Sequence, residues 1–121
     1  MIIVWSDGGV HANGKATSSG YGSFLVDGED EIHRLVFTEW CTNNITEYKT
    51  LISAMEYVKD ISDDVEFRVD SQLVERQVSG RYACNLSHLV PLRDRVRDLL
   101  KQPDRRLTWV GRDEIVRKLG H

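Results

Sequence analysis

The sequence has little cysteine, little proline and no long apolar run, and each shortage excludes a class of protein. Its 121 residues include two Cys and two Pro, too few for a disulfide scaffold or a proline-rich segment. Cys41 and Cys84 have no Cys or His partner at zinc-site spacing, so we expect both to be reduced packing residues. The apolar run at residues 1–5 is too short for a signal sequence or a membrane span. We therefore expect a cytoplasmic protein without membrane association.

An excess of basic residues is also missing. The formal net charge is −3 and the pI is about 5.8, which argues against binding of nucleic acid through a broad basic surface. Bound cations can offset the charge of a carboxylate-rich site, so net charge alone does not exclude such binding. The composition, 40% hydrophobic and 29% charged, is typical of a globular domain. With no repeat or linker in view, we expect one domain over residues 1–121.

Apolar periodicity predicts nine elements in the order βββαβααβα. Strands are expected at residues 2–6, 21–26, 32–38, 65–69 and 106–110. Helices are expected at residues 45–58, 71–79, 89–100 and 113–119, with Gly80 ending the second and Pro91 in the first turn of the third. Asp7-Gly8-Gly9 should end the first strand and lead into a loop through Gly20. The fold class predicted is α/β, a five-stranded mixed sheet with flanking helices.

Three carboxylates stand where this order would bring them together: Asp7, Glu47 and Asp70. Hard cations such as Mg²⁺ prefer oxygen ligands, and a pair of such ions can drive phosphodiester hydrolysis. Each residue also has a plain structural interpretation. Asp7 fits a turn, Glu47 fits a capping box with Asn44, and Asp70 fits the cap of the following helix.

Three motifs around these carboxylates resemble the type I ribonuclease H family. The first is Ser6-Asp7-Gly8-Gly9, the second is Thr42-Asn43-Asn44-Ile45-Thr46-Glu47-Tyr48, and the third is Val69-Asp70-Ser71-Gln72-Leu73-Val74. The resemblance continues through residues 77–82 and the helix at 86–100, and reaches Trp109, Val110 and Arg112. The chain is most similar to the compact archaeal, bacterial and phage variant that lacks an inserted basic protrusion.

This resemblance implies a ribonuclease H-like fold and a metal-dependent endonuclease. The expected reaction is hydrolysis of the RNA strand of an RNA/DNA hybrid by two Mg²⁺ ions, with Mn²⁺ as a substitute, leaving 5′-phosphate and 3′-hydroxyl ends. Asp7, Glu47 and Asp70 are the implied catalytic metal ligands. The implied substrate-binding residues are Gly8, Gly9, Asn43, Asn44, Ser71 and Gln72. We expect a monomer, with double-stranded RNA as an alternative substrate.

The chain departs from the family at its C-terminus, where a fourth carboxylate is usual. Counting from Arg112 in the family pattern Arg-x-x-Asn-x-x-Ala-Asp places Ile115, Lys118 and Leu119 at the last three named positions. With a shortened loop, Asp113 would serve as the fourth catalytic and metal-binding residue, with Glu114 as the alternative. Asp113 also fits a simple acid at a helix start. A fold that kept nucleic-acid binding without catalysis is the main rival function.

Overall fold

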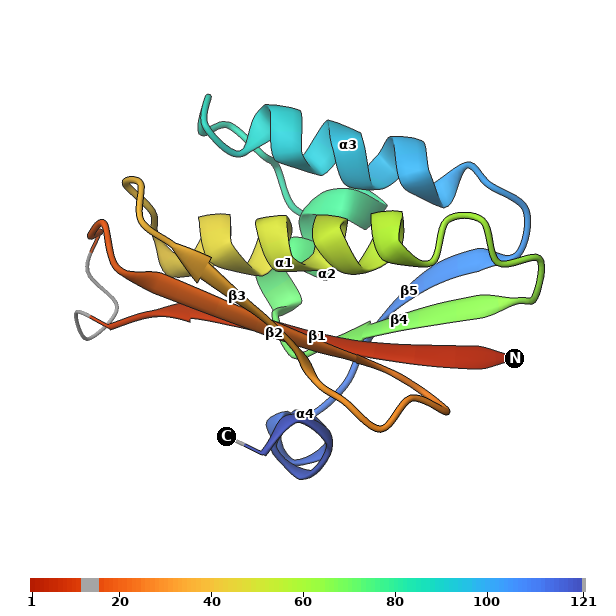
Figure 1. Ribbon diagram of the computed structural model, residues 1–121. Coiled ribbons are helices and arrows are strands. Elements are labelled where there is room, and N and C mark those ends of the chain that lie inside the picture. The colour runs from red at the N-terminus through yellow and green to blue at the C-terminus, as the bar shows by residue number, and fades with distance from the viewer. Residues whose placement is uncertain (12–15, 121) are drawn as a thin grey trace.

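The computed structural model describes residues 1–11 and 16–120, and confirms the expected element order (Figure 1). The strands are β1 (Ile2–Val10), β2 (Gly20–Val26), β3 (His33–Phe37), β4 (Val65–Val69) and β5 (Arg105–Trp109). The helices are α1 (Asn43–Tyr57), α2 (Gln72–Ser79), α3 (Val90–Leu100) and α4 (Arg112–Leu119). Residues 12–15 of the expected loop after the first strand lie outside the described part.

The five strands form one mixed sheet in the order β3-β2-β1-β4-β5. β1 and β3 are both antiparallel to β2, whereas β4 is parallel to β1 and β5 is parallel to β4. The register between β1 and β4 pairs Trp5 with Arg68. The carboxyl ends of these two strands therefore lie side by side at the middle of the sheet.

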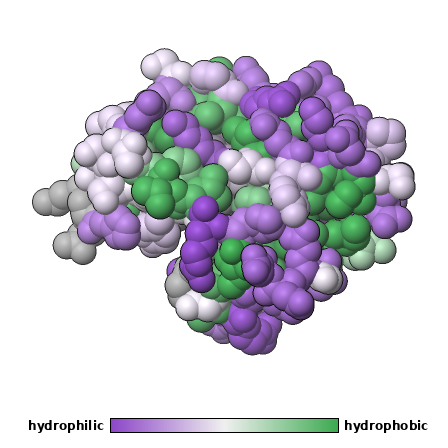
Figure 2. Space-filling model, in the orientation of Figure 1, coloured by the Kyte–Doolittle hydropathy of each residue, from purple (hydrophilic) through white to green (hydrophobic). Residues whose placement is uncertain are grey.

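Helices cover both faces of the sheet unequally. α1, α2 and α3 lie on one side and α4 lies alone on the other (Figure 1). The larger core lies under α1 and includes the fully buried Tyr48, Leu51 and Phe67. A small second cluster, formed by Trp5, Ile115 and Leu119, attaches α4. Hydrophilic residues cover much of the outer surface of α3 and α4 (Figure 2).

The first strand is longer than the sequence predicted. It does not end at Ser6 but runs through Asp7, Gly8 and Gly9 to Val10, so the interpretation of the two glycines as a turn is wrong. A Cβ on Gly8 would lie 2.6 Å from the backbone carbonyl of Thr46 in α1. Glycine is required here because a helix backbone approaches the strand closely.

The start of α1 also differs from the expectation. Its N-cap is Thr42, whose hydroxyl accepts a hydrogen bond from the Ile45 N–H at 3.2 Å, so the predicted Asn44–Glu47 capping box is wrong. Asn43 instead accepts a hydrogen bond from the Val10 N–H at 3.1 Å. Thr42, Asn43 and Asn44 are all residue types that favour the N-cap position, so the local pattern did not decide among them.

The interpretation of Asp70 as the cap of the following helix is also wrong. Ser71 caps α2, and its hydroxyl accepts a hydrogen bond from the Val74 N–H at 3.2 Å. Other expected local features are confirmed. Gly80 ends α2 in the left-handed region at a φ of 87°. Cys41 and Cys84 are buried, and neither forms a disulfide bond. Within residues 1–11 and 16–120, no helix has the length and apolarity needed to span a membrane.

We expect Gly8→Ala to destabilise the fold by about 2–3 kcal/mol, because the added methyl meets backbone that cannot move aside. The measurement is urea unfolding followed by circular dichroism. Gly111→Ala is the matched control, since nothing lies within 4 Å of its added Cβ and its φ is −68°; its loss should stay below about 1 kcal/mol. Equal losses would contradict the close-packing argument.

Candidate metal centre

The predicted carboxylates Asp7, Glu47 and Asp70 come together from β1, from α1 and from the residue that follows β4. Each offers an oxygen atom, and these atoms all lie within 4.8 Å of one another. Asp7 lies two residues beyond Trp5 and Asp70 two beyond Arg68, so the parallel register of β1 and β4 sets them side by side. Glu47 is added by α1, which packs against β1 next to Gly8.

The cluster is poorly solvated, which raises the electrostatic free energy of its charged state. Asp7 is 3% exposed, the Asp70 side chain is 10% exposed, and Glu47 is partly buried. Burial, followed by the hydrogen bond and negative charge of Asp7, raises the pKa of Glu47 well above its usual value. Burial also raises the pKa of Asp70, although a hydrogen bond from Arg112 opposes this shift.

A guanidinium group already contacts two of the three carboxylates. The Nη1 atom of Arg112 lies 2.8 Å from Asp7 Oδ2 and 2.6 Å from Asp70 Oδ2. Arg112 is the first residue of α4, and its side chain is 54% exposed. The two hydrogen bonds, to Asp70 and then Asp7, raise the pKa of Arg112 further, so its positive charge is permanent.

The position of Arg112 depends on how α4 is attached to the sheet. Glu114 accepts hydrogen bonds from Trp5 Nε1 at 2.8 Å and from Arg68 Nη1 at 2.7 Å. Ile115 and Leu119 are 0% and 1% exposed in the cluster with Trp5. Burial against Trp5 explains why Ile115 and Leu119 stand where the family pattern has Asn and Asp. The hydrogen bonds from Trp5 and Arg68 give Glu114 a structural role away from the carboxylate cluster.

Asp113, the expected fourth ligand, is not brought into the cluster. Within the described part of the chain, the group able to hold a metal ion consists of Asp7, Glu47 and Asp70. Asp113 is exposed in the first turn of α4. There a negative charge is favoured by the helix dipole.

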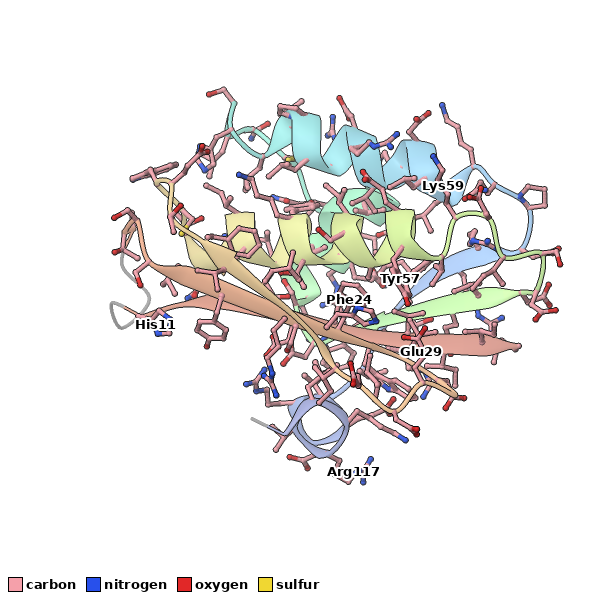
Figure 3. The ribbon with its side chains drawn as sticks, in the orientation of Figure 1. His11, Phe24, Glu29, Tyr57, Lys59 and Arg117 are labelled. Carbon is pink, nitrogen blue, oxygen red and sulfur yellow. The ribbon has the colours of Figure 1, made fainter. Side chains whose placement is uncertain are left out.

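The carboxylates lie in an open depression whose lining matches most of the predicted substrate-binding residues. Gln72 is not among the lining residues, which are Asp7, Gly8, Gly9, Tyr21, Asn43, Asn44, Glu47, Asp70, Ser71 and Arg112. Sequence reasoning did not assign Tyr21 or Arg112 to the site. Tyr21 pairs with Gly9 across β1 and β2, and its ring lies 5.0 Å from that of His11, which is labelled in Figure 3. For Arg112 the available signal was its place at the start of the family's C-terminal pattern.

The donor set fits a hard divalent cation. All three converging side chains offer carboxylate oxygen, and neither Cys nor His belongs to the cluster, a composition that suits Mg²⁺ or Mn²⁺ rather than Zn²⁺. Two of the carboxylates are nearly desolvated, so a nearby positive charge stabilises them strongly.

Comparison with known proteins gives a consistent family. The chain is 42% identical to ribonuclease HI of Halobacterium salinarum over 93 residues, covering 76% of this chain but only 44% of that protein. It thus spans less than half of that curated relative. The crystal structure of RNase H1 from Halobacterium salinarum matches with a TM-score of 0.83 and 31% identity, over 96% of this chain and 89% of that one.

A further solved structure has the same fold. LC11-RNase H1, which was isolated from compost, in complex with an RNA/DNA hybrid matches with a TM-score of 0.81 and 23% identity. The match covers 97% of this chain and 90% of that one. No protein-family model matches the chain.

We expect Glu47→Gln to stabilise the metal-free protein at neutral pH. The folded-state pKa of Glu47 is raised, so its ionisation opposes folding above its unfolded pKa and the penalty disappears when the pH falls below that value. The gain should be about 0.5–2 kcal/mol in urea unfolding with EDTA at pH 7, and should vanish near pH 3.

Glu114→Gln is the matched control with the opposite sign. Hydrogen bonds from Trp5 and then Arg68 lower the pKa of Glu114, so its ionisation stabilises the fold above its unfolded pKa and is lost in acid. This substitution should therefore destabilise the protein at pH 7. Stabilisation by both substitutions would contradict the charge assignments.

Proposed function

The chain belongs to the type I ribonuclease H family, and we propose that it is an endoribonuclease that hydrolyses the RNA strand of RNA/DNA hybrids. The observation that carries the proposal is the convergence of Asp7, Glu47 and Asp70, from the family's three motifs, within 4.8 Å. Relatives support it, because three proteins that this chain is similar to are named ribonuclease HI or RNase H1, and one of them is bound to such a hybrid.

Divalent metal ions are the cofactors of this family, and we propose Mg²⁺ as a pair, with Mn²⁺ as a substitute. Asp7, Glu47 and Asp70 would hold them. When bound, such ions activate the attacking water and stabilise the leaving oxygen of the phosphodiester. Asp113 is left out of the proposed ligand set because it stands outside the carboxylate cluster.

The chain's own residues have three tasks in this proposal. The nearly buried Asp7 and Asp70 keep their oxygens in fixed positions, because each is carried by the backbone of a central strand or its end. Glu47 completes the cluster from α1. Gly8 and Gly9 line the depression, and their missing side chains let the Thr46 backbone and the Tyr21 ring pack close beside it.

Recognition of the hybrid would use the same depression. Asn43 and Asn44 begin α1 beside Glu47, where they can hydrogen-bond the 2′-hydroxyls that distinguish RNA from DNA. Gly8, Gly9, Ser71 and Gln72 would contact the duplex through backbone N–H groups and short polar side chains. Such contacts position a duplex without reading its sequence, so we propose cleavage with little sequence preference.

We expect metal-dependent cutting of the hybrid's RNA strand, lost by about 100-fold or more in Asp70→Asn, because the substitution removes a carboxylate charge from the metal-binding cluster. The assay compares labelled hybrid, single-stranded RNA, double-stranded RNA and double-stranded DNA with Mg²⁺, Mn²⁺ or EDTA. Asp60→Asn, an exposed acid outside the depression, is the control. Cutting of double-stranded RNA alone would change the substrate, and hybrid binding without cutting would favour the non-catalytic module.

Asn44→Ala should raise the KM for hybrid several-fold with an unchanged free energy of unfolding, because the side chain is proposed to contact substrate. Asn43→Ala should also destabilise the fold, by about 1 kcal/mol, since the Val10 N–H would lose its acceptor. Steady-state kinetics and urea unfolding of both variants separate the two effects. An unchanged KM in Asn44→Ala would remove that residue from the substrate site.

A further inference from the structure

We propose that Arg112 is a built-in counter-cation: it occupies the carboxylates Asp7 and Asp70 in the metal-free protein and must leave them before divalent cations bind. The inference rests on the proposed metal site. It adds that the chain itself competes with the metal for the same oxygen atoms and so sets the metal concentration at which the site fills.

The first support is the geometry of the contact. A single nitrogen atom, Nη1 of Arg112, lies 2.8 Å from Asp7 Oδ2 and 2.6 Å from Asp70 Oδ2. Both distances are those of strong charge-assisted hydrogen bonds. A cation bound between Asp7 and Asp70 would share these carboxylates with a guanidinium of like charge, and the repulsion between the two cations favours release of the guanidinium.

The second support is burial. Asp7 is 3% exposed and the Asp70 side chain 10% exposed, and two like charges so poorly hydrated require a positive partner. Arg112 supplies one positive charge to a cluster of three carboxylates. A divalent cation supplies two, but meets a weaker field while the guanidinium remains in place.

The third support is that Arg112 can leave without disturbing the helix that carries it. α4 is attached by Glu114, which is bonded to Trp5 and Arg68, and by the buried Ile115 and Leu119. None of these contacts involves the Arg112 side chain, which is 54% exposed and therefore has solvent to swing into. The two arrangements thus differ mainly in the side-chain torsions of one residue.

The apparent metal affinity depends on the fraction of molecules in which the guanidinium has left the carboxylates. When the binding-competent state is a fraction of the population, the apparent dissociation constant is the intrinsic one divided by that fraction. If the guanidinium is bound to the carboxylates about nine-tenths of the time, removing it should tighten metal binding about tenfold. If Arg112 instead helped to hold the carboxylates in position for the metal, its removal would weaken binding.

The test is calorimetric titration of Mn²⁺ into EDTA-stripped wild-type protein, Arg112→Gln and Arg117→Gln, without nucleic acid. Arg117 is labelled in Figure 3, lies on the same helix and is exposed, so its substitution removes an equal charge away from the depression. We expect about tenfold tighter binding in Arg112→Gln and wild-type affinity in Arg117→Gln. An affinity in Arg112→Gln equal to or weaker than wild type overturns the proposal.

A second measurement uses the wild-type chain and does not depend on the folding of a variant. The side-chain ¹⁵N resonances of Arg112 should move toward those of a solvated arginine as Mg²⁺ is added, because the guanidinium is released. Resonances that stay unchanged while Mg²⁺ saturates the protein overturn the proposal.

The outcomes also separate this inference from the proposed function. Metal binding and hybrid cleavage by the wild type, with equal affinities in wild type and Arg112→Gln, would overturn the counter-cation alone. No metal binding by either protein would overturn both the counter-cation and the metal site on which the proposed nuclease depends.

Discussion

The parallel pairing of β1 with β4 is the constraint on which the site depends. It places the ends of two central strands together and with them Asp7 and Asp70, two carboxylates that water reaches poorly. Like charges in such surroundings destabilise the folded protein unless a cation is present. The strand pairing therefore makes a nearby positive charge favourable at this point of the sheet. The neighbouring helices α1 and α4 both place a charged side chain there.

The contact between α1 and β1 adds the third carboxylate. Gly8 lets the helix backbone at Thr46 come so near to the strand that a methyl group would not fit, and the Asn43 side chain ties the first turn of the helix to Val10. Glu47 is thereby held one turn into α1, beside Asp7. Its raised pKa reflects this forced proximity as well as burial. The unfavourable local electrostatics are consistent with a site retained for function.

The helix α4 lies on the sheet face opposite α1 and brings a positive charge to the same carboxylate cluster. Trp5 and Arg68 fix Glu114, and apolar side chains fix the rest of the helix, so Arg112 begins α4 beside Asp7 and Asp70. An acidic chain with a net charge of −3 thus contains a local cation at its most acidic buried point. Net charge is a poor guide to such a site, because pairing at short range decides its electrostatics.

The sequence by itself determined the element order, the cap at Gly80 and the three carboxylates, because periodicity and short motifs encode local structure directly. It placed the cap at Asn44 instead of Thr42, because neighbouring residues of similar capping preference are not distinguished by local pattern. It misjudged Gly8 and Gly9 as a turn, because Gly8 is required by a contact with α1 that is distant along the chain. Tyr21 and Arg112 were missed for the same reason. Arg112 lies 105 residues from Asp7 in sequence, and only the packing of α4 against the sheet decides that their side chains meet.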